Sequence, residues 1–396
     1  MVLALRRLIA AVVSSGATIA VNCASPPPPA QPAPVVAAPD ERLLVIEARK
    51  HARARNFDSA DRVYDQAYAV ARSFDVLLER VELLLRIGRP TRGQELAKLY
   101  YDANPTDADG GHLYAETLIA GNKGQQALEV IEKLLHVSPQ DAAAHEKRGR
   151  ALMLFGTTQD SLDEFRKAVQ LDPTSAAFHM SLGSALHKMG EINEAALEFR
   201  SALKRAPDDP LAHVLVGMAL RDQDELDESK SYLDKALQLD PENGRAYFEL
   251  GLLYNRQLKQ VEAEAALAKA VELSPSDARF WYAYGEIYRL QQRFDEAIKA
   301  YRRAIEVDPP YGKAIGKLGQ LLVIRNAFDD AEPLLIKAIA QDRGIAANYF
   351  SLGLVYLSRG DATLANENLT RFLELAPRND PDRDRARDAL KQLKRK

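Results

Sequence analysis

The sequence predicts an all-α superhelical solenoid of about ten helix-turn-helix repeats. Three observations predict it: residues that recur every 34 positions, two amphipathic helix patterns in each period, and a charged helix pattern after the last period. Prolines mark the period at Pro105, Pro139, Pro173, Pro207, Pro241, Pro275 and Pro309. Glycines keep the same step at Gly149, Gly183, Gly217, Gly251, Gly285, Gly319 and Gly353. A fixed period of this length is the sequence signature of a repeat architecture.

One complete unit runs from Ala278 to Tyr311 and has the sequence ARFWYAYGEIYRLQQRFDEAIKAYRRAIEVDPPY. Its apolar residues recur at helical spacing in two halves, which predicts two helices. The first half carries Trp281, Tyr284, Gly285 and Tyr288, and the second carries Phe294, Ala297, Tyr301 and Ala304. Glycine and alanine let helices approach closely, and the aromatic side chains fill the volume between them. We number each unit from position 1, occupied here by Ala278, to position 34.

These residues resemble the tetratricopeptide repeat (TPR), whose pattern is W-x₂-L-G-x₂-Y…A-x₃-F…P. The resemblance spans residues 41–379 and is strongest over 142–379. It weakens toward the N-terminus, where Ala115 and Val81 stand in the glycine position of their units. Residues 380–396 predict a capping helix that begins at Asp380–Pro381 and has a narrow apolar stripe of Ala386, Leu390 and Leu393.

The first 40 residues predict an export signal followed by a tether. Residues 1–22 combine Arg6 and Arg7 with a short apolar stretch, which is typical of a signal peptide. That stretch is shorter than the ~20 residues needed to span a bilayer. Residues 23–40 are rich in proline and alanine, and such a composition favours an extended polyproline II tether.

Cys23 is the single cysteine of the chain and stands between the signal and the tether. This placement resembles the lipid-attachment site of bacterial lipoproteins. The sequence departs from that family's pattern at Asn22, where a small residue is usual, and at Ala20, where leucine is usual. Two alternatives remain: ordinary signal cleavage, after Ala20 or Ala24 for example, and a cytoplasmic protein with an unusual N-terminus. One cysteine excludes an intrachain disulfide framework and a multi-cysteine zinc site.

The composition favours neither nucleic-acid binding nor catalysis. A net charge of −3 gives no basic surface for nucleic acid. No motif for a nucleophile, a metal or a cofactor stands outside the repeat pattern. His145, His179 and His213 are spaced by one period, but they occupy the position of Trp281, so we expect them to pack rather than to bind a metal. We therefore expect a non-enzymatic protein with no cofactor and no metal.

Protein binding is the remaining function, and the TPR resemblance implies that the first helix of each repeat lines a concave groove. Positions 5 and 9 give this groove an apolar centre of Met180, Val214, Met218, Phe248, Leu252 and Tyr282. Positions 2 and 12 predict a basic rim of Arg221, Arg245, Arg279, Arg289 and Lys313. Such a groove favours peptide or protein partners with an apolar core and acidic flanks. The alternative is that these side chains contact one another across a tightly wound superhelix.

The sequence thus favours an exported, lipid-anchored TPR scaffold that helps to assemble cell-envelope machinery of the pilus, secretion or cell-wall type. Ala24 after Cys23 resembles the pattern of outer-membrane lipoproteins that face the periplasm. A soluble periplasmic protein is the alternative localisation. A regulatory TPR subunit that holds a catalytic partner enzyme is the alternative function.

Overall fold

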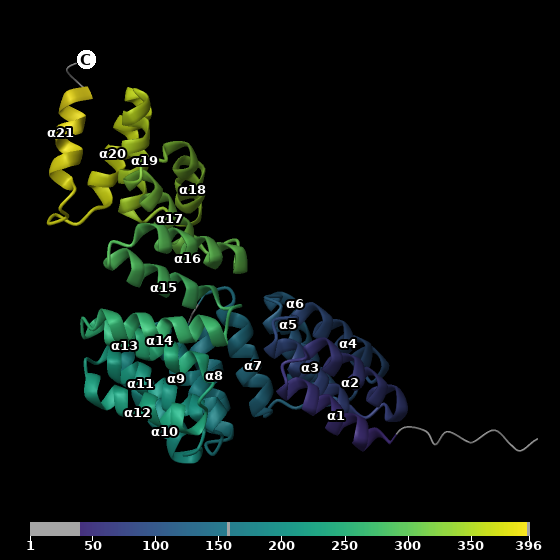
Figure 1. Ribbon diagram of the computed structural model, residues 1–396. Helices are drawn as coiled ribbons and strands as arrows, with labels where there is room; N and C mark the ends of the chain where they lie inside the picture. The colour runs from purple at the N-terminus through teal and green to yellow at the C-terminus, as the bar shows by residue number, and fades with distance from the viewer. Residues whose placement is uncertain (1–39, 157–158, 394–396) are drawn as a thin grey trace, which may run out of the picture.

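The computed structural model describes residues 40–156 and 159–393, and these residues form 21 α-helices without a strand (Figure 1). The first helix of each pair is α1 (Glu41–Arg53), α3 (Phe74–Arg86), α5 (Ala108–Ala120), α7 (Ala142–Met153), α9 (Ala176–Lys188), α11 (Pro210–Asp222), α13 (Gly244–Arg256), α15 (Ala278–Leu290), α17 (Gly312–Ile324) and α19 (Ala346–Arg359). The second is α2 (Phe57–Ala71), α4 (Pro90–Ala103), α6 (Gly124–Val137), α8 (Gln159–Leu171), α10 (Ile192–Arg205), α12 (Leu226–Leu239), α14 (Gln260–Leu273), α16 (Phe294–Val307), α18 (Phe328–Gln341) and α20 (Ala362–Leu375). Ten pairs and a final helix, α21 (Arg383–Leu393), confirm the predicted solenoid.

Short polar side chains start many of the first helices. Asp141, Asn243 and Asp277, for example, each accept a hydrogen bond from a backbone N–H in the first turn that follows. Such caps satisfy donors that the helix itself leaves free. Within a pair, the chain turns through one residue with positive φ. This residue recurs every 34 positions as Gly88, Asn122, Gly156, Gly190, Asp224, Leu258, Gln292, Asn326 and Gly360.

The recurring glycine makes room for a large side chain on the second helix of its own pair. A Cβ added to Gly183 would lie 2.6 Å from the ring of Phe199, and one added to Gly251 would lie 2.5 Å from Leu267. Real side chains do not approach so closely, so the slot admits only glycine while the partner is large. The same contact pairs Gly149 with Phe165, Gly217 with Leu233, Gly285 with Tyr301, Gly319 with Leu335 and Gly353 with Leu369.

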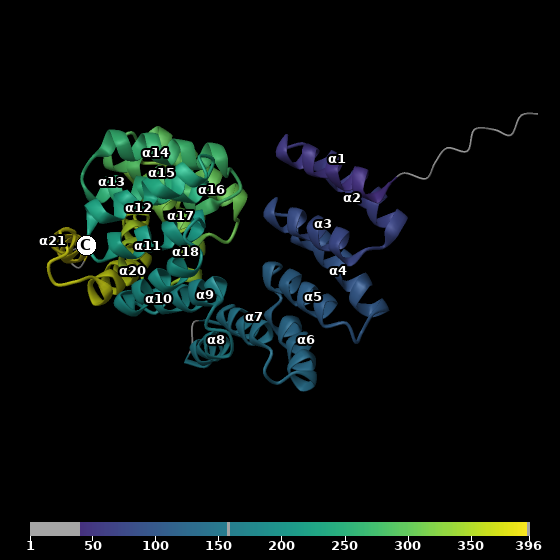
Figure 2. The ribbon, with the colours of Figure 1, turned by 90° about the horizontal axis from the view of Figure 1, so that it is seen from below.

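The pairs stack into a curved array, and the view from below shows α1 to α10 following an arc (Figure 2). Arg55, after α1, forms an ion pair of 2.9 Å with Glu242, in the connection between α12 and α13. The first repeat therefore lies beside the connection between the sixth and seventh repeats, one superhelical turn further on. A cavity of about 920 Å³ between them is lined by side chains that include Arg53, Arg86 and Asp240.

The C-terminal helix covers the last repeat, as predicted, although it starts later than the sequence indicated. α21 begins at Arg383 rather than near Pro381, because Asp380 holds a turn in which its carboxylate accepts the Asp382 N–H at 2.9 Å. The Arg383 guanidinium donates to the carbonyls of Leu373 and Ala376 at the end of α20. Ala386 is fully buried against this repeat.

Candidate interaction surface

The concave surface of the array is formed by the odd-numbered helices. Neighbouring odd-numbered helices, such as α11 and α13 or α17 and α19, contact one another directly in addition to their even-numbered partners. Helices that touch in this way lie on the side of smaller radius. The first helix of each pair therefore lies on the inside of the curve.

The predicted apolar centre is only partly accessible. Met180, Phe248, Leu252 and Tyr282 are half-buried, so a partner can reach them. Val214 is fully buried and Met218 is 9% exposed, which corrects their assignment to a binding surface. Val214 lies in a core cluster with Ala246 and Leu250 of the next inner helix, because adjacent inner helices pack closely enough to cover a small side chain at position 5.

The aromatic part of the accessible centre lies on α13 and α15. The ring of Phe248 stacks on that of Phe280, with centroids 4.6 Å apart and planes at 19°. The ring of Tyr282 meets that of Tyr311 edge-on at 5.6 Å. Burial, together with the nearby Glu286 carboxylate, raises the pKa of Tyr282 to about 12. Its hydroxyl therefore stays protonated near neutral pH and can donate a hydrogen bond.

The predicted basic rim divides into paired and unpaired cations. Arg221 is only 11% exposed and bonds to Asp222 at 2.9 Å and to Glu249, so it belongs to an internal network and not to a rim. Asp222 also accepts a bond of 2.7 Å from His187 when that ring carries the proton, which links α9 to α11. Sequence reasoning missed this network, because Glu249 stands at position 6 and its burial depends on how neighbouring repeats pack.

The remaining predicted rim cations lie on α13, α15 and α17. Arg279 is exposed and pairs with Asp277 at 2.5 Å, and Arg289 pairs with Glu286 at 2.9 Å. Lys313 is exposed at the start of α17. Arg245 is half-buried, and among the residues that the structure describes no carboxylate oxygen lies within 4.0 Å of its guanidinium nitrogens. Burial lowers the pKa of its guanidinium, although the group stays charged at neutral pH.

Two further regions extend the inner surface. On α5 to α9 it is polar: Arg150 binds Glu116 through two hydrogen bonds of 2.7 Å, and Ser181 donates to Glu146 at 2.7 Å.

At the C-terminal end of the array, a cavity of about 560 Å³ opens between α17, α19 and the start of α21. Its lining includes Val323, Phe350, Leu354, Asp382 and Arg385. The Arg385 guanidinium lies 5.4 Å from the centroid of the Phe350 ring.

The histidines with one-period spacing pack as the sequence predicted. Nε2 of His145, His179 and His213 lies within 3.3 Å of the carbonyl oxygen of the proline six residues earlier. The indole N–H of Trp281 donates to the equivalent carbonyl of Pro275 at 2.9 Å. Among the described residues no group of three or more histidine, cysteine or carboxylate side chains is placed to hold a metal ion.

The N-terminal predictions fall outside the described residues. The signal at 1–22, Cys23 and nearly all of the tether at 23–40 precede Asp40, where the description begins. Within residues 40–156 and 159–393, every helix is too short or too polar to cross a bilayer.

Comparison with solved structures supports the architecture. The chain aligns over 89% of its length with the APC/C hetero-tetramer Cut9–Hcn1, at 17% identity, 76% coverage of that chain and a TM-score of 0.58. It aligns over 86% with the human IFIT1 dimer bound to PPP-AAAA, at 17% identity, 91% coverage of that chain and a TM-score of 0.53. Yeast Tom70 aligns with 89% of the chain, at 16% identity, 95% coverage of that chain and a TM-score of 0.50. Identities this low establish the fold alone. Among the curated proteins, none matches this sequence.

Two family models match the sequence itself. One model of the tetratricopeptide repeat matches residues 115–176, 214–276 and 261–312, and another matches 152–218 and 288–352. Together they cover residues 115–352 without a gap, which is more than half of the chain. The same residues form the stacked helix pairs and the glycine slots described above. The chain therefore belongs to the tetratricopeptide-repeat family.

Proposed function

We propose that this TPR protein is a non-enzymatic scaffold that binds a segment of a partner protein on α13 and α15 of its inner surface. Binding of proteins or peptides is the general role of TPR arrays, so the proposal concerns the place and the partner. The observation that carries it is the half-buried Phe248, stacked on Phe280, on the same helix as Arg245, which has no ion pair among the described residues. Large aromatic side chains in partly covered sites commonly supply most of the free energy of binding.

The charges of this site favour an acidic residue in the partner. Glu249 is bound by Arg221 and Asp277 by Arg279, so both carboxylates near Arg245 already have partners. A half-buried guanidinium without an ion pair has lost part of its hydration and gains most from an incoming carboxylate. The partner segment would therefore place an apolar side chain against Phe248 and an Asp or Glu side chain against Arg245. Arg279 and Lys313 would guide its approach.

Replacement of the aromatic anchor tests the site. Phe248→Ala should weaken binding by about 2 kcal/mol, or roughly 30-fold, because truncation removes a buried aromatic contact. The measurement is partner recovery from cell extracts on immobilised protein, followed by titration of the recovered partner. Leu197→Ala is the matched control, since Leu197 is 62% exposed on α10 and should leave recovery unchanged. If Phe248→Ala unfolds the protein while the folded fraction still binds normally, Phe248 is a core residue and the proposed site is wrong.

Charge reversal separates the rim from the anchor. The double change Arg279→Glu and Lys313→Glu should slow association, and the defect should shrink as salt is added, because rim charges act mainly on encounter. A defect confined to the dissociation rate, and independent of salt, would remove Arg279 from the steering role. Recovery of an enzyme whose activity depends on this chain would favour the regulatory alternative over a structural scaffold.

We also propose export and lipid anchoring at Cys23, with a function in assembling cell-envelope machinery. The support is the order of Arg6–Arg7, a short apolar stretch, a single cysteine and a proline-rich tether. The test is Cys23→Ser followed by cell fractionation and gel mobility. A lipid anchor predicts that the variant leaves the membrane fraction and changes mobility. Unchanged fractionation and mobility would contradict the anchor, and a wild-type protein found only in the soluble envelope fraction would favour simple export.

A further inference from the structure

The start of the C-terminal helix forms one wall of a cavity besides covering the last repeat. This cavity, of about 560 Å³, lies between α17 and α19, the first helices of the last two repeats. Arg385 of α21 and Asp382, just before that helix, line it from the C-terminal side. Its volume is in the range of ~300–1,000 Å³ that is usual for sites that hold a ligand.

The walls that the repeats contribute are mainly apolar. Val323, Phe350 and Leu354 lie on α17 and α19, and Ile324 and Phe328 stand on either side of the turn that follows α17. Ile324 is 61% exposed, so apolar surface at this cavity remains open to solvent. Removing such surface from water is favourable. The cavity therefore favours an apolar side chain of a ligand.

The charges at the cavity are already balanced. Among the described residues, Asp382 and Arg385 are the only ionisable side chains in its lining, and they pair at 2.7 Å. The Arg385 guanidinium also lies 5.4 Å from the centroid of the Phe350 ring, close enough for a cation–π contact. A charged side chain of a ligand would lose hydration here without gaining a free counter-ion. The cavity therefore favours an uncharged ligand.

Two polar side chains at the cavity have hydrogen-bonding capacity left. Ser351 is 8% exposed and lines the cavity, and its hydroxyl has no hydrogen-bond partner within the part of the chain that the structure describes. Gln320 is half-buried, and one N–H of its amide donates to the Asn348 side-chain oxygen at 2.7 Å. Its second N–H and its own carbonyl oxygen remain for a ligand. Because an unpaired buried hydroxyl costs free energy, a ligand that bonds to Ser351 gains affinity.

These polar groups match the backbone of an extended segment. Each peptide group offers one carbonyl acceptor and one N–H donor. In a helix these groups bond to one another except at the two ends, so a helical partner would leave Ser351 and Gln320 unmatched. A purely apolar small molecule would leave them unmatched as well. The occupant that fits is an extended segment with an uncharged apolar side chain.

We propose that the last two repeats and α21 form a second protein-binding site, which takes an extended segment of a partner protein. An uncharged apolar side chain of that segment, such as leucine or phenylalanine, enters the cavity beside Phe350, and the adjoining backbone bonds to Ser351 and Gln320. Helix α21 thereby contributes to binding as well as to capping, through Arg385. This site is separate from the one on α13 and α15 and differs from it in disfavouring an acidic side chain.

Titration of labelled peptides with the full chain, followed by fluorescence polarisation, tests the site. The probes are acetylated Ala-Ala-Xaa-Ala-Ala amides with Phe, Leu, Asp or Lys at Xaa, and the two apolar peptides should bind at least tenfold more tightly than the two charged ones. Ser351→Ala should weaken binding of the Phe peptide about fivefold, since it removes one hydrogen bond. Ser358→Ala is the matched control, because this hydroxyl lies on the same helix, donates to the Val355 carbonyl and is outside the cavity.

A bulky residue in the lining tests the place of binding independently. Ala347 lines the cavity and is exposed, so Ala347→Phe should obstruct the cavity without disturbing the core. It should weaken binding of the Phe peptide more than tenfold. Ala340→Phe is its control, since Ala340 is exposed on α18 and lies outside the cavity. Circular dichroism should show the same helical content for all four variants.

Three results would overturn the proposal. In the first, the charged peptides bind as tightly as the apolar ones, or none of the four binds at millimolar concentration. In the second, binding of the Phe peptide persists in Ala347→Phe and is lost in Phe248→Ala instead, which would assign the peptide to the site on α13 and α15. In the third, toluene displaces the Phe peptide as effectively as the unlabelled peptide does, which would assign the cavity to small apolar molecules.

Discussion

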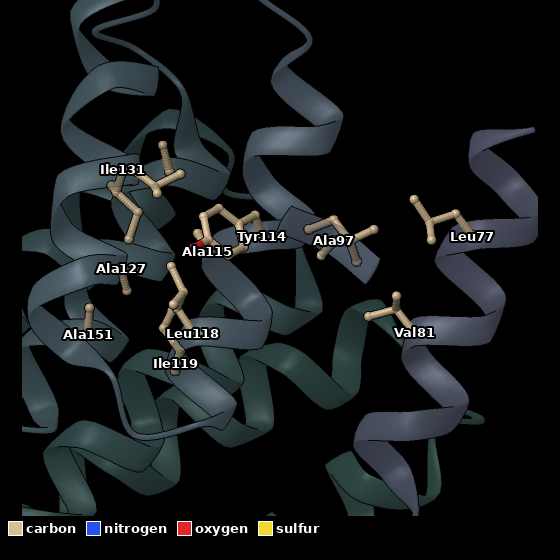
Figure 3. Packing of buried hydrophobic residues seen from close by; sticks show 13 residues of the cluster. Leu77, Val81, Ala97, Tyr114, Ala115, Leu118, Ile119, Ala127, Ile131 and Ala151 are labelled. Atoms are coloured by element: carbon tan, nitrogen blue, oxygen red, sulfur yellow. The ribbon is translucent and has the colours of Figure 1, made fainter. Parts of the chain in front are cut away.

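The second repeat and the seventh repeat fill the same interface in opposite ways. In the seventh, Gly251 on α13 leaves space that Leu267 on α14 occupies. In the second, the large residue is on the first helix: Val81 on α3 faces Gly93 and Ala97 on α4, with a Val81 methyl 3.5 Å from the Cβ position of Gly93 (Figure 3). The third repeat is intermediate, with Ala115 opposite Ile131.

The comparison shows that the repeat conserves the combined volume of the two facing positions and not the residue at either one. A pattern that requires glycine at position 8 therefore misses a repeat in which the large and small residues have changed sides. The family models match from residue 115 onward, yet α1 to α4 form the same helix pairs. Close packing explains this tolerance, because interiors respond to volume more than to sequence.

The largest loss of stability should come from truncating a large side chain that packs against one of the recurring glycines. Phe165 is 1% exposed and its ring would lie 2.9 Å from a Cβ on Gly149. Phe165→Ala should destabilise the array by about 3–5 kcal/mol, because a glycine opposite cannot fill the cavity. Denaturant unfolding followed by circular dichroism measures the loss, with the exposed Leu197→Ala as control at ~0.5 kcal/mol or less. Equal losses for both variants would show that the slot is not a packed core.

Exchanging the large and the small side chain between α3 and α4 of the second repeat tests whether these two positions share one volume. Ala97→Leu alone should overpack against Val81 and cost about 1–3 kcal/mol. Val81→Gly alone should also destabilise, since it leaves a cavity and puts glycine in a helix. Together they recreate the pairing of Gly251 with Leu267, so the double variant should lose less than the sum of the two losses. Strict additivity in the double-mutant cycle would mean that the two positions do not share one volume.

Acid should weaken the N-terminal repeats by a smaller amount. A hydrogen bond from Arg49 keeps the pKa of Glu79 below its ordinary value, with a further bond from the Tyr64 hydroxyl. A lowered pKa in the folded state stabilises the fold above the unfolded value of ~4.3, and this contribution disappears as the pH falls through the folded value. Glu79→Gln should therefore cost ~0.5 kcal/mol at pH 7 and progressively less below pH 4. A cost independent of pH would exclude the carboxylate as its source.

The period alone predicts most of the fold, because glycine, proline and aromatic positions recur in phase and each marks a local contact. It does not predict which inner side chains stay accessible. Phe248 and Val214 share position 5, yet Phe248 is half-buried and Val214 is fully covered by the next inner helix. Likewise, Arg221 and Arg289 share position 12, but only Arg221 is enclosed, by Asp222 and Glu249. The accessibility of an inner side chain depends on its size and on how closely the next repeat packs. The sequence of one repeat alone does not determine that packing.

The ion pair between Arg55 and Glu242 is a weak contact between two distant parts of the array. It joins residues 187 positions apart, whereas the Arg150–Glu116 pair between neighbouring repeats joins residues 34 apart. Both of its side chains are more than half exposed, and such pairs contribute only ~0–1 kcal/mol. An ion pair of that strength changes the equilibrium between the conformations with and without this contact by less than tenfold. The curvature of the array is therefore set mainly by packing between neighbouring repeats, and this pair adds little to it.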